Sequence, residues 1–284
     1  MNLFYVMGGG MGHLFRIAVF IKQFAIEDYA ILSSNALAFR LFPESKIIFI
    51  SPENYEEAWK SFVSERLPTL HIEKLFIDSF PFGLTAEFSS WPAVNYPVYY
   101  LARRLKWSNY KSTIKHMEFD FETVYQLEEL EEEHLIFVKS KTKNIKQLTL
   151  NYPPPEKIDL SAFKIPSDKL LWLIVHAFDA DELEMLVQYA EEVAEHEECN
   201  PYFVVISDQE ITVDNGVCIR YFPAVDWFPL AARIFCGAGF NTVHQVKPFL
   251  SKTTLIPFPR KYDDQAWRAG MLYNSTRAPE AGYD

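Results

Sequence analysis

The chain has 284 residues, enough for two cores of ordinary domain size, and 49% of them are hydrophobic. Its formal net charge of −11 argues against bulk electrostatic attraction to nucleic acid or to an anionic membrane surface. Three widely spaced cysteines form no C-x-x-C pair, which indicates reduced thiols rather than a disulfide framework or a metal site. The sequence has neither a signal-peptide pattern nor an apolar segment of transmembrane length, so we expect a cytoplasmic protein.

Short apolar runs alternate with amphipathic stretches along the first half of the chain. This alternation is typical of a parallel sheet covered by helices. Apolar residues between Leu14 and Phe24 recur at helical spacing, and a second helix is expected over Glu53–Arg66. The expected strands are Leu3–Met7, Ala30–Ser33, Lys46–Ile50, Lys74–Asp78, Val98–Leu101, Thr123–Leu127 and Leu135–Val138.

Three consecutive prolines, Pro153–Pro155, stop any helix or central strand and stiffen the chain. They predict an N-terminal domain over 1–152, a proline-containing linker over 153–168 and a shorter C-terminal domain over 169–284. In the second domain, Asp179 and Glu182 form a capping-box pattern at the start of a helix. Its expected strands are Leu170–Val175, Tyr202–Ile206, Val217–Tyr221, Arg233–Cys236 and Thr253–Ile256. Two α/β domains imply a cleft, with ligands at the carboxyl ends of the strands.

A glycine-rich turn directly follows the first expected strand and precedes the first expected helix. Such glycines let the backbone approach a ligand closely, while the free amides at the helix start favour negative charge. His13, at the mouth of this turn, is a candidate general base because its ordinary pKa is near neutral. Arg16, one helical turn on, is either a solvent-facing residue, the partner of an acid or a contact for an anionic substrate. The candidate acceptor or phosphate loop comprises Gly9, Gly10, Gly12 and Arg16.

A similar small-residue turn follows the expected strand that ends at Cys236. Asn241 or Thr242 would cap the next helix and leave its amides for a phosphate. The loop from Pro257 to Gln265 contains Arg260 and Lys261, which suit phosphate, and Asp264 and Gln265, which suit sugar hydroxyls. The alternative is an ordinary charged surface loop. The candidate donor-binding residues are Gly237, Gly239, Asn241, Thr242, Gln245, Arg260, Asp264 and Gln265.

The sequence resembles GT-B glycosyltransferases, particularly the group of the peptidoglycan lipid-linked N-acetylglucosaminyltransferase. The resemblance lies in three stretches: Gly8–Arg16, Gly237–Thr242 and Pro257–Gln265. The resemblance implies a GT-B fold, with two Rossmann-like α/β domains of mostly parallel strands facing across a cleft. It also implies an acceptor held by the N-terminal domain, a nucleotide-sugar held by the C-terminal one, and no cofactor or bound metal. A UDP-sugar is one candidate donor. The partners expected are therefore this donor and an acceptor of unknown identity, with no nucleic acid.

The resemblance also suggests individual roles. His13 falls on the glycine-loop histidine, which serves as catalytic base in some members. Gly239 and Thr242 fall on the loop that faces the donor diphosphate, whereas Asp264 and Gln265 fall on the pair that holds donor-sugar hydroxyls. The expected reaction is an inverting transfer to an acceptor hydroxyl.

The sequence also departs from the family pattern. Gln245 stands where many members have a ribose-binding glutamate, and an amide lacks charge-assisted strength. The chain ends about twenty residues after Gln265, so the usual C-terminal helices that return to the first domain are expected to be missing. Two alternatives follow: a GT-B-fold sugar-nucleotide epimerase or hydrolase, and a non-catalytic member that binds a sugar nucleotide or a partner.

Overall fold

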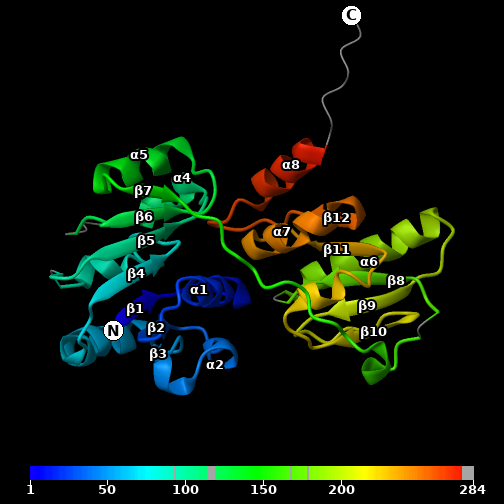
Figure 1. Ribbon diagram of the computed structural model, residues 1–284, viewed down its shortest axis with the longest axis horizontal. Coiled ribbons are helices and arrows are strands. Elements are labelled where there is room, and N and C mark those ends of the chain that lie inside the picture. Colours follow the sequence, from blue (N-terminus) through cyan, green and yellow to red (C-terminus); the bar gives the residue numbers. More distant parts are fainter. Residues whose placement is uncertain (93, 114–118, 167, 178, 277–284) are drawn as a thin grey trace, which may run out of the picture. The chain divides into compact units, whose positions relative to one another are not determined.

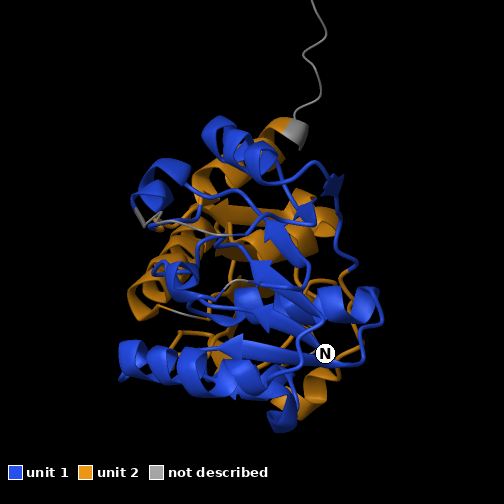
Figure 2. Cartoon of the chain, turned by 90° about the vertical axis from the view of Figure 1, so that its left-hand side faces the viewer, with its two compact units in different colours: residues 1–151, 261–263 blue, residues 152–260, 264–284 orange. Residues whose placement is uncertain are grey.

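The computed structural model describes residues 1–92, 94–113, 119–166, 168–177 and 179–276. It divides into two compact units, shown in different colours in Figure 2. Unit 1 comprises residues 1–151 and 261–263, and unit 2 comprises residues 152–260 and 264–284, of which the last eight lie outside the described residues. No helix in the described ranges is both long and apolar enough to cross a membrane.

Unit 1 is built on a seven-stranded parallel sheet of order β3-β2-β1-β4-β5-β6-β7 (Figure 1). Its central strands are apolar on both faces because helices and loops cover them. The strands are β1 (Asn2–Tyr5), β2 (Tyr29–Ser33), β3 (Ile47–Phe49), β4 (Lys74–Asp78), β5 (Val98–Ala102), β6 (Thr123–Gln126) and β7 (Ile145–Gln147). The α-helices are α1 (Met11–Gln23), α2 (Ala38–Leu41), α3 (Tyr55–Ser61), α4 (Trp107–Tyr110) and α5 (Glu132–Lys141).

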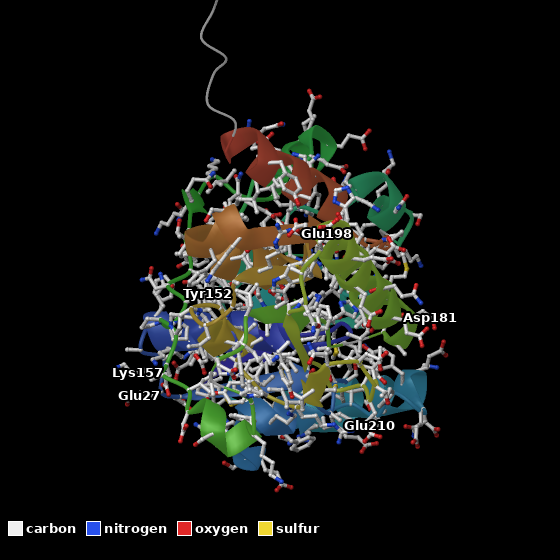
Figure 3. All side chains as sticks on the ribbon, turned by 90° about the vertical axis from the view of Figure 1, so that its right-hand side faces the viewer. Glu27, Tyr152, Lys157, Asp181, Glu198 and Glu210 are labelled. Carbon is white, nitrogen blue, oxygen red and sulfur yellow. The ribbon has the colours of Figure 1, made fainter. Side chains whose placement is uncertain are left out.

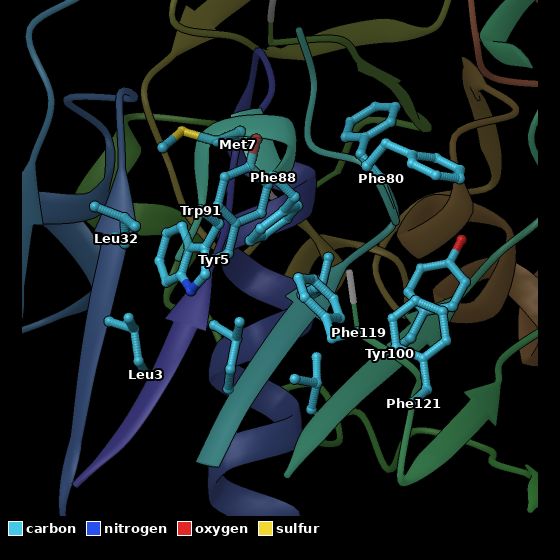
Figure 4. Close-up of a cluster of buried hydrophobic side chains, with 14 of the residues drawn as sticks. Leu3, Tyr5, Met7, Leu32, Phe80, Phe88, Trp91, Tyr100, Phe119 and Phe121 are labelled. Atoms are coloured by element: carbon cyan, nitrogen blue, oxygen red, sulfur yellow. The ribbon is translucent and has the colours of Figure 1, made fainter. Parts of the chain in front are cut away.

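Aromatic side chains fill much of the core on one face of this sheet. Tyr5, Phe88 and Trp91 gather there (Figure 4), and the rings of Tyr5 and Phe88 lie 4.8 Å apart. The Tyr5 hydroxyl accepts a hydrogen bond from the Leu84 amide at 2.9 Å, so burial of this ring leaves its polar atom satisfied. This packing fixes the segment that follows β4, which contributes to the candidate site.

Two expectations for unit 1 need correction. The prediction of a strand at Leu135–Val138 is wrong, because this segment lies within α5. Glu132 and Glu133 occupy the first turn of α5, and Lys139 and Lys141 occupy its last, an arrangement that complements the helix dipole. The helix expected over 53–66 is α-helical only in α3; a π-helical turn (Phe62–Arg66) continues it, and a 3-10 turn (Leu67–Thr69) follows beyond the expected range.

Unit 2 is built on a five-stranded parallel sheet of order β10-β9-β8-β11-β12. Asp179 caps α6, since its Oδ1 accepts from the Glu182 amide at 3.0 Å. Figure 3 labels Asp181 in the first turn of α6 and Glu198 just beyond its end. The strands are β8 (Leu171–Val175), β9 (Tyr202–Ile206), β10 (Gly216–Ile219), β11 (Arg233–Gly237) and β12 (Thr253–Ile256); the α-helices are α6 (Ala180–His196), α7 (Phe240–Val246) and α8 (Gln265–Thr276).

The chain passes from unit 1 to unit 2 just before the proline run. On the unit 1 side, Gln23 accepts from the Asn151 amide at 2.9 Å and donates to the Thr149 carbonyl at 3.1 Å. On the unit 2 side, the Glu156 amide donates to Asp226 Oδ1 at 2.9 Å. Residues 153–168, expected as a linker, fall in unit 2 and include a 3-10 turn, Leu160–Phe163.

Candidate functional site

The glycine turn and Asp78 meet at one edge of the unit 1 sheet. β1 and β4 are parallel neighbours, with Tyr5 opposite Ile77. The residues that follow β1 and the last residue of β4 therefore come together at the carboxyl ends of these strands, where parallel sheets bind ligands. The first turn of α1 places His13 over this edge.

His13 and Asp78 form a tight pair. His13 Nδ1 lies 2.6 Å from Asp78 Oδ2, and the Asp78 side chain is fully buried whereas that of His13 is 13% exposed. A terminal nitrogen of Arg16 also lies 3.1 Å from Nδ1, but the carboxylate is closer and can only accept. The proton of the neutral ring therefore lies on Nδ1, and Nε2 keeps a lone pair. The ring also stacks on Phe80, with centroids 5.6 Å apart. The pair therefore has the tautomer that a general base at Nε2 requires.

Arg16 supplies the countercharge. It is 2% exposed, and it donates from Nε to Asp78 Oδ1 at 2.8 Å and from a terminal nitrogen to Oδ2 at 2.7 Å. Burial alone would raise the pKa of the Asp78 carboxyl, but the Arg16 charge and the bonds from His13 and Arg16 hold that pKa well below its usual range. Of the roles considered for Arg16, the structure shows the partner of an acid.

Burial has the opposite consequence for the histidine. It lowers the pKa of His13, with Arg16 and Arg103 adding to this effect, while Asp78 acts against it. The imidazole is therefore neutral at pH 7. A neutral ring beside an ionised carboxylate can take up a proton, and the carboxylate then stabilises the cation that forms.

The backbone conformation of the turn explains why two of its positions are occupied by glycine. Gly8 and Gly10 have φ values of +131° and +75°, which L side chains rarely adopt. A Cβ on Gly8 would also lie 2.8 Å from His13 Nε2. Asn35, after β2, donates to the Gly10 carbonyl at 2.8 Å and so fixes the turn from outside. Gly9 and Gly12 are exposed.

The predicted donor turn in unit 2 lies at the carboxyl end of β11. Gly237 ends that strand, and Gly239 is the N-cap residue of α7, without a side-chain capping bond. The expectation that Asn241 or Thr242 caps this helix is therefore wrong, because the helix begins earlier, at Phe240. A Cβ on Gly239 would meet only Thr242 Oγ1, at 3.7 Å, so the space beside this residue is open. Asn241 accepts from the Tyr152 hydroxyl at 2.7 Å, while Thr242 and Gln245 lie half-buried on α7.

The loop after β12 is held by its own polar residues. Gln265 Oε1 accepts from the Phe258 amide at 3.0 Å, and Gln265 is only 7% exposed. Asp264 Oδ1 accepts from the Trp267 amide at 3.2 Å and so caps α8. In this structure both side chains therefore order the loop itself. The Lys261 ammonium lies 4.8 Å from the centre of the Tyr262 ring.

Arg260 makes a bidentate ion pair with Glu182 of α6, in which a terminal nitrogen lies 2.5 Å from Oε2. His176, directly after β8, brings its Nε2 to 3.0 Å from the same carboxylate oxygen. Its ring lies 5.1 Å from that of Phe258. Burial lowers the pKa of His176, while Glu182 opposes this effect. Near the carboxyl ends of β8 and β12, the His176 ring and the Arg260 guanidinium thus both lie against the Glu182 carboxylate.

Several of these residues were missed from the sequence. Asp78 was recognised only as the end of an apolar strand, and Glu182 only as half of a capping box. A carboxylate that ends an otherwise apolar strand would have been the signal for Asp78, because ligands bind at the carboxyl ends of parallel strands. The corresponding signal for His176 is its position directly after the apolar strand β8.

No family model matches the sequence, and the comparison with curated proteins found no match. Solved structures do resemble it. UDP-GlcNAc 2-epimerase from Neisseria meningitidis, bound to UDP-GlcNAc, superposes with a TM-score of 0.61 at 10% identity, over 95% of this chain and 85% of that one. MurG from Acinetobacter baumannii gives 0.57 at 13% identity, over 96% and 83%. The glycosyltransferase SnogD from Streptomyces nogalater gives 0.56 at 12%, over 97% and 84%.

Proposed function

Because this chain has the GT-B fold of the glycosyltransferases and epimerases that it resembles, we propose that it transfers a sugar from a nucleotide-sugar to an acceptor hydroxyl. The observation that carries this proposal is the buried pair of His13 and Asp78, whose geometry suits a general base at Nε2. Unit 1 would hold the acceptor and unit 2 the donor. A UDP-sugar is the donor class to test first, since one similar structure contains UDP-GlcNAc.

In this mechanism His13 Nε2 takes the proton of the acceptor hydroxyl while that oxygen attacks the anomeric carbon. The bond from this carbon to the diphosphate oxygen breaks, its electron pair leaves with the nucleoside diphosphate, and the configuration inverts. Asp78 stabilises the imidazolium without accepting its proton. Arg16 keeps Asp78 ionised throughout. Amides at the start of α7 and Arg260, from the loop after β12, would receive the leaving diphosphate, without a metal ion.

The proposal is tested by incubating the protein with a panel of nucleotide-sugars, with and without hydroxyl acceptors, and measuring the nucleotide released. A donor that binds should first reveal itself in melting curves. At a concentration of about 100 times its Kd, it should stabilise the fold by about 2.7 kcal/mol. Donor binding without release under any acceptor would contradict the proposed transfer and favour the non-catalytic alternative.

The acid limb of the pH profile should lie below pH 6.5. The base must be neutral to act, and burial lowers the pKa of His13, so activity should persist to a lower pH than with an exposed histidine. The measurement is kcat/KM for the acceptor between pH 4 and 8. An acid limb centred above pH 7 would contradict the role of this ring.

Replacing Gly239 by aspartate should abolish nucleotide binding. The variant should fold, because Gly239 has an ordinary φ of −66° and a Cβ there meets only one atom within 4 Å. Its carboxylate, however, would stand at the start of α7 and repel a phosphate there. Calorimetric titration with the nucleotide checks this. Gly239→Ala is the matched control and should bind, and unchanged affinity in Gly239→Asp would remove the donor assignment.

The cluster in unit 2 favours one second candidate, an epimerase acting on a sugar nucleotide. His176 and Glu182 place an acid–base pair at the carboxyl end of β8, which a simple transferase does not need. An epimerase needs no acceptor, so it should convert the donor to its epimer when incubated with the donor alone. NMR of the sugar after such an incubation distinguishes the two reactions. An unchanged sugar would exclude this candidate for that donor.

A further inference from the structure

Three residues outside the histidine pair extend its network through the interior of unit 1. Ser79 Oγ accepts from Arg16 at 2.8 Å and from Arg103 Nε at 2.9 Å, and it lies 3.2 Å from Asp78 Oδ2. Both lone pairs of the hydroxyl are thus used by the two arginines, which directs its proton to Asp78. Arg103 is 5% exposed, and its terminal nitrogen Nη1 makes an ion pair with Asp263.

Ser79 adopts a backbone conformation that costs free energy. Its φ is +65°, and the Phe80 amide donates across it to the Asp78 carbonyl at 2.7 Å, the pattern of a γ-turn. Non-glycine residues persist in such a conformation only when their surroundings fix them, and these positions cluster at functional sites. Here the Tyr100 hydroxyl holds the Ser79 carbonyl at 2.8 Å. Ser79 is therefore a fixed junction between Asp78 and Arg103.

Asp263 is supplied by a segment distant in sequence. Residues 261–263 belong to unit 1, where the Lys106 backbone amide donates to the Tyr262 carbonyl at 2.8 Å and Asn109 Nδ2 donates to the Lys261 carbonyl at 2.9 Å. Asp263 itself forms an antiparallel bridge with Leu105. These contacts hold the segment that carries the Asp263 carboxylate in place, so the charge of Arg103 is met by a fixed anion rather than by solvent.

We propose that Arg103 and Asp263 are positioning residues for His13, which act through Ser79 and Asp78 to hold the ring and set the balance of charge around it. The role in catalysis rests on the proposed function, whereas the effect on the ring does not. Two buried cations, Arg16 and Arg103, are balanced by two acids, Asp78 and Asp263. Residues 261–263 therefore complete the candidate site of unit 1.

The charged groups facing His13 define the expected response. They are Asp78 on β4, Arg16 on α1, and Arg103 after β5, with Asp263 paired to the last of these. Removing the charge of Asp263 leaves the Arg103 cation uncompensated, which disfavours protonation of His13. Removing the charge of Arg103 leaves the Asp263 anion, which favours it. The two single variants should therefore act in opposite directions.

The experiment measures the pKa of His13 by NMR titration of its ring, assigned by the signals lost in His13→Gln. Asp263→Asn, which keeps an acceptor oxygen for Arg103, should lower that pKa by about one unit, and Arg103→Gln should raise it by about one unit. The double variant should return it to within a few tenths of a unit of the wild type. Glu133→Gln, in an exposed pair with Lys111, changes the net charge as Asp263→Asn does and should leave it unchanged.

Melting curves for each variant show whether the fold is intact. If both single variants move the pKa of His13 in the same direction, towards 6.5, the pair acts only by keeping the region packed, and the proposal is overturned. Shifts no larger than that of Glu133→Gln overturn it as well. The acid limb of kcat/KM is followed in parallel. Opposite shifts of the ring pKa without matching shifts of this limb support the positioning role and count against His13 as the base.

Discussion

Replacing His13 by alanine is expected to lower turnover about 10²–10⁴-fold, the usual contribution of a general base. Nucleotide affinity should stay nearly unchanged, because the donor is assigned to unit 2. The fold should survive, since the ring is partly exposed and Asp78 keeps both bonds from Arg16. Steady-state kinetics, a nucleotide titration and a melting curve on the same preparation test the three parts of this expectation.

His71→Ala is the matched control, because His71 is an exposed histidine in the same unit. It should leave turnover and melting temperature unchanged. If His13→Ala lowers the melting temperature but keeps turnover per folded molecule within a factor of a few, His13 is a structural residue. The base would then have to be another group.

Replacing Asp78 by asparagine should damage both activity and stability. The amide can donate to His13 Nδ1 and thereby move the ring proton to Nε2, the wrong tautomer for a base, and a comparable change in serine proteases costs about 10⁴-fold in kcat. Arg16, 2% exposed, would also lose its carboxylate, which for a buried pair costs about 3–5 kcal/mol. Kinetics and melting curves measure the two losses separately.

The pH dependence of this loss has a defined sign. The pKa of Asp78 is lowered in the folded protein, so its ionised form stabilises the fold above about pH 4, the ordinary carboxyl range, and this contribution is lost as the pH falls further. The gap in stability between wild type and Asp78→Asn should therefore narrow below about pH 4. Asp120→Asn, in an exposed pair with Lys141, should change stability by no more than about 0.5 kcal/mol. An Asp78→Asn protein with wild-type stability and turnover would contradict the proposed site.

The secondary structure followed from the sequence wherever the pattern was long or bounded by clear signals. β1 and α1 have a glycine turn between them, and α6 begins at a capping aspartate. The run Leu135–Val138 was misassigned because four apolar residues fit a buried strand and a short helix equally well. The flanking acids and lysines, which favour a helix, were the better evidence. β7, an edge strand with the sequence Ile-Lys-Gln, has no apolar run to reveal it.

For the candidate site, the sequence by itself determined where the glycine turn lies and which histidine follows it. That is local information, because the glycines, the strand before them and the helix after them are contiguous. Only the tertiary structure decided that β1 pairs with β4. This pairing brings Asp78 to His13, although 65 residues separate them along the chain. The tertiary structure also decided that Asp263 pairs with Arg103, from which it is 160 residues distant in the sequence. The reason is physical: a buried charge needs an opposite charge within a few Å, and it is the order of strands in a sheet, rather than spacing in sequence, that decides which residue provides it.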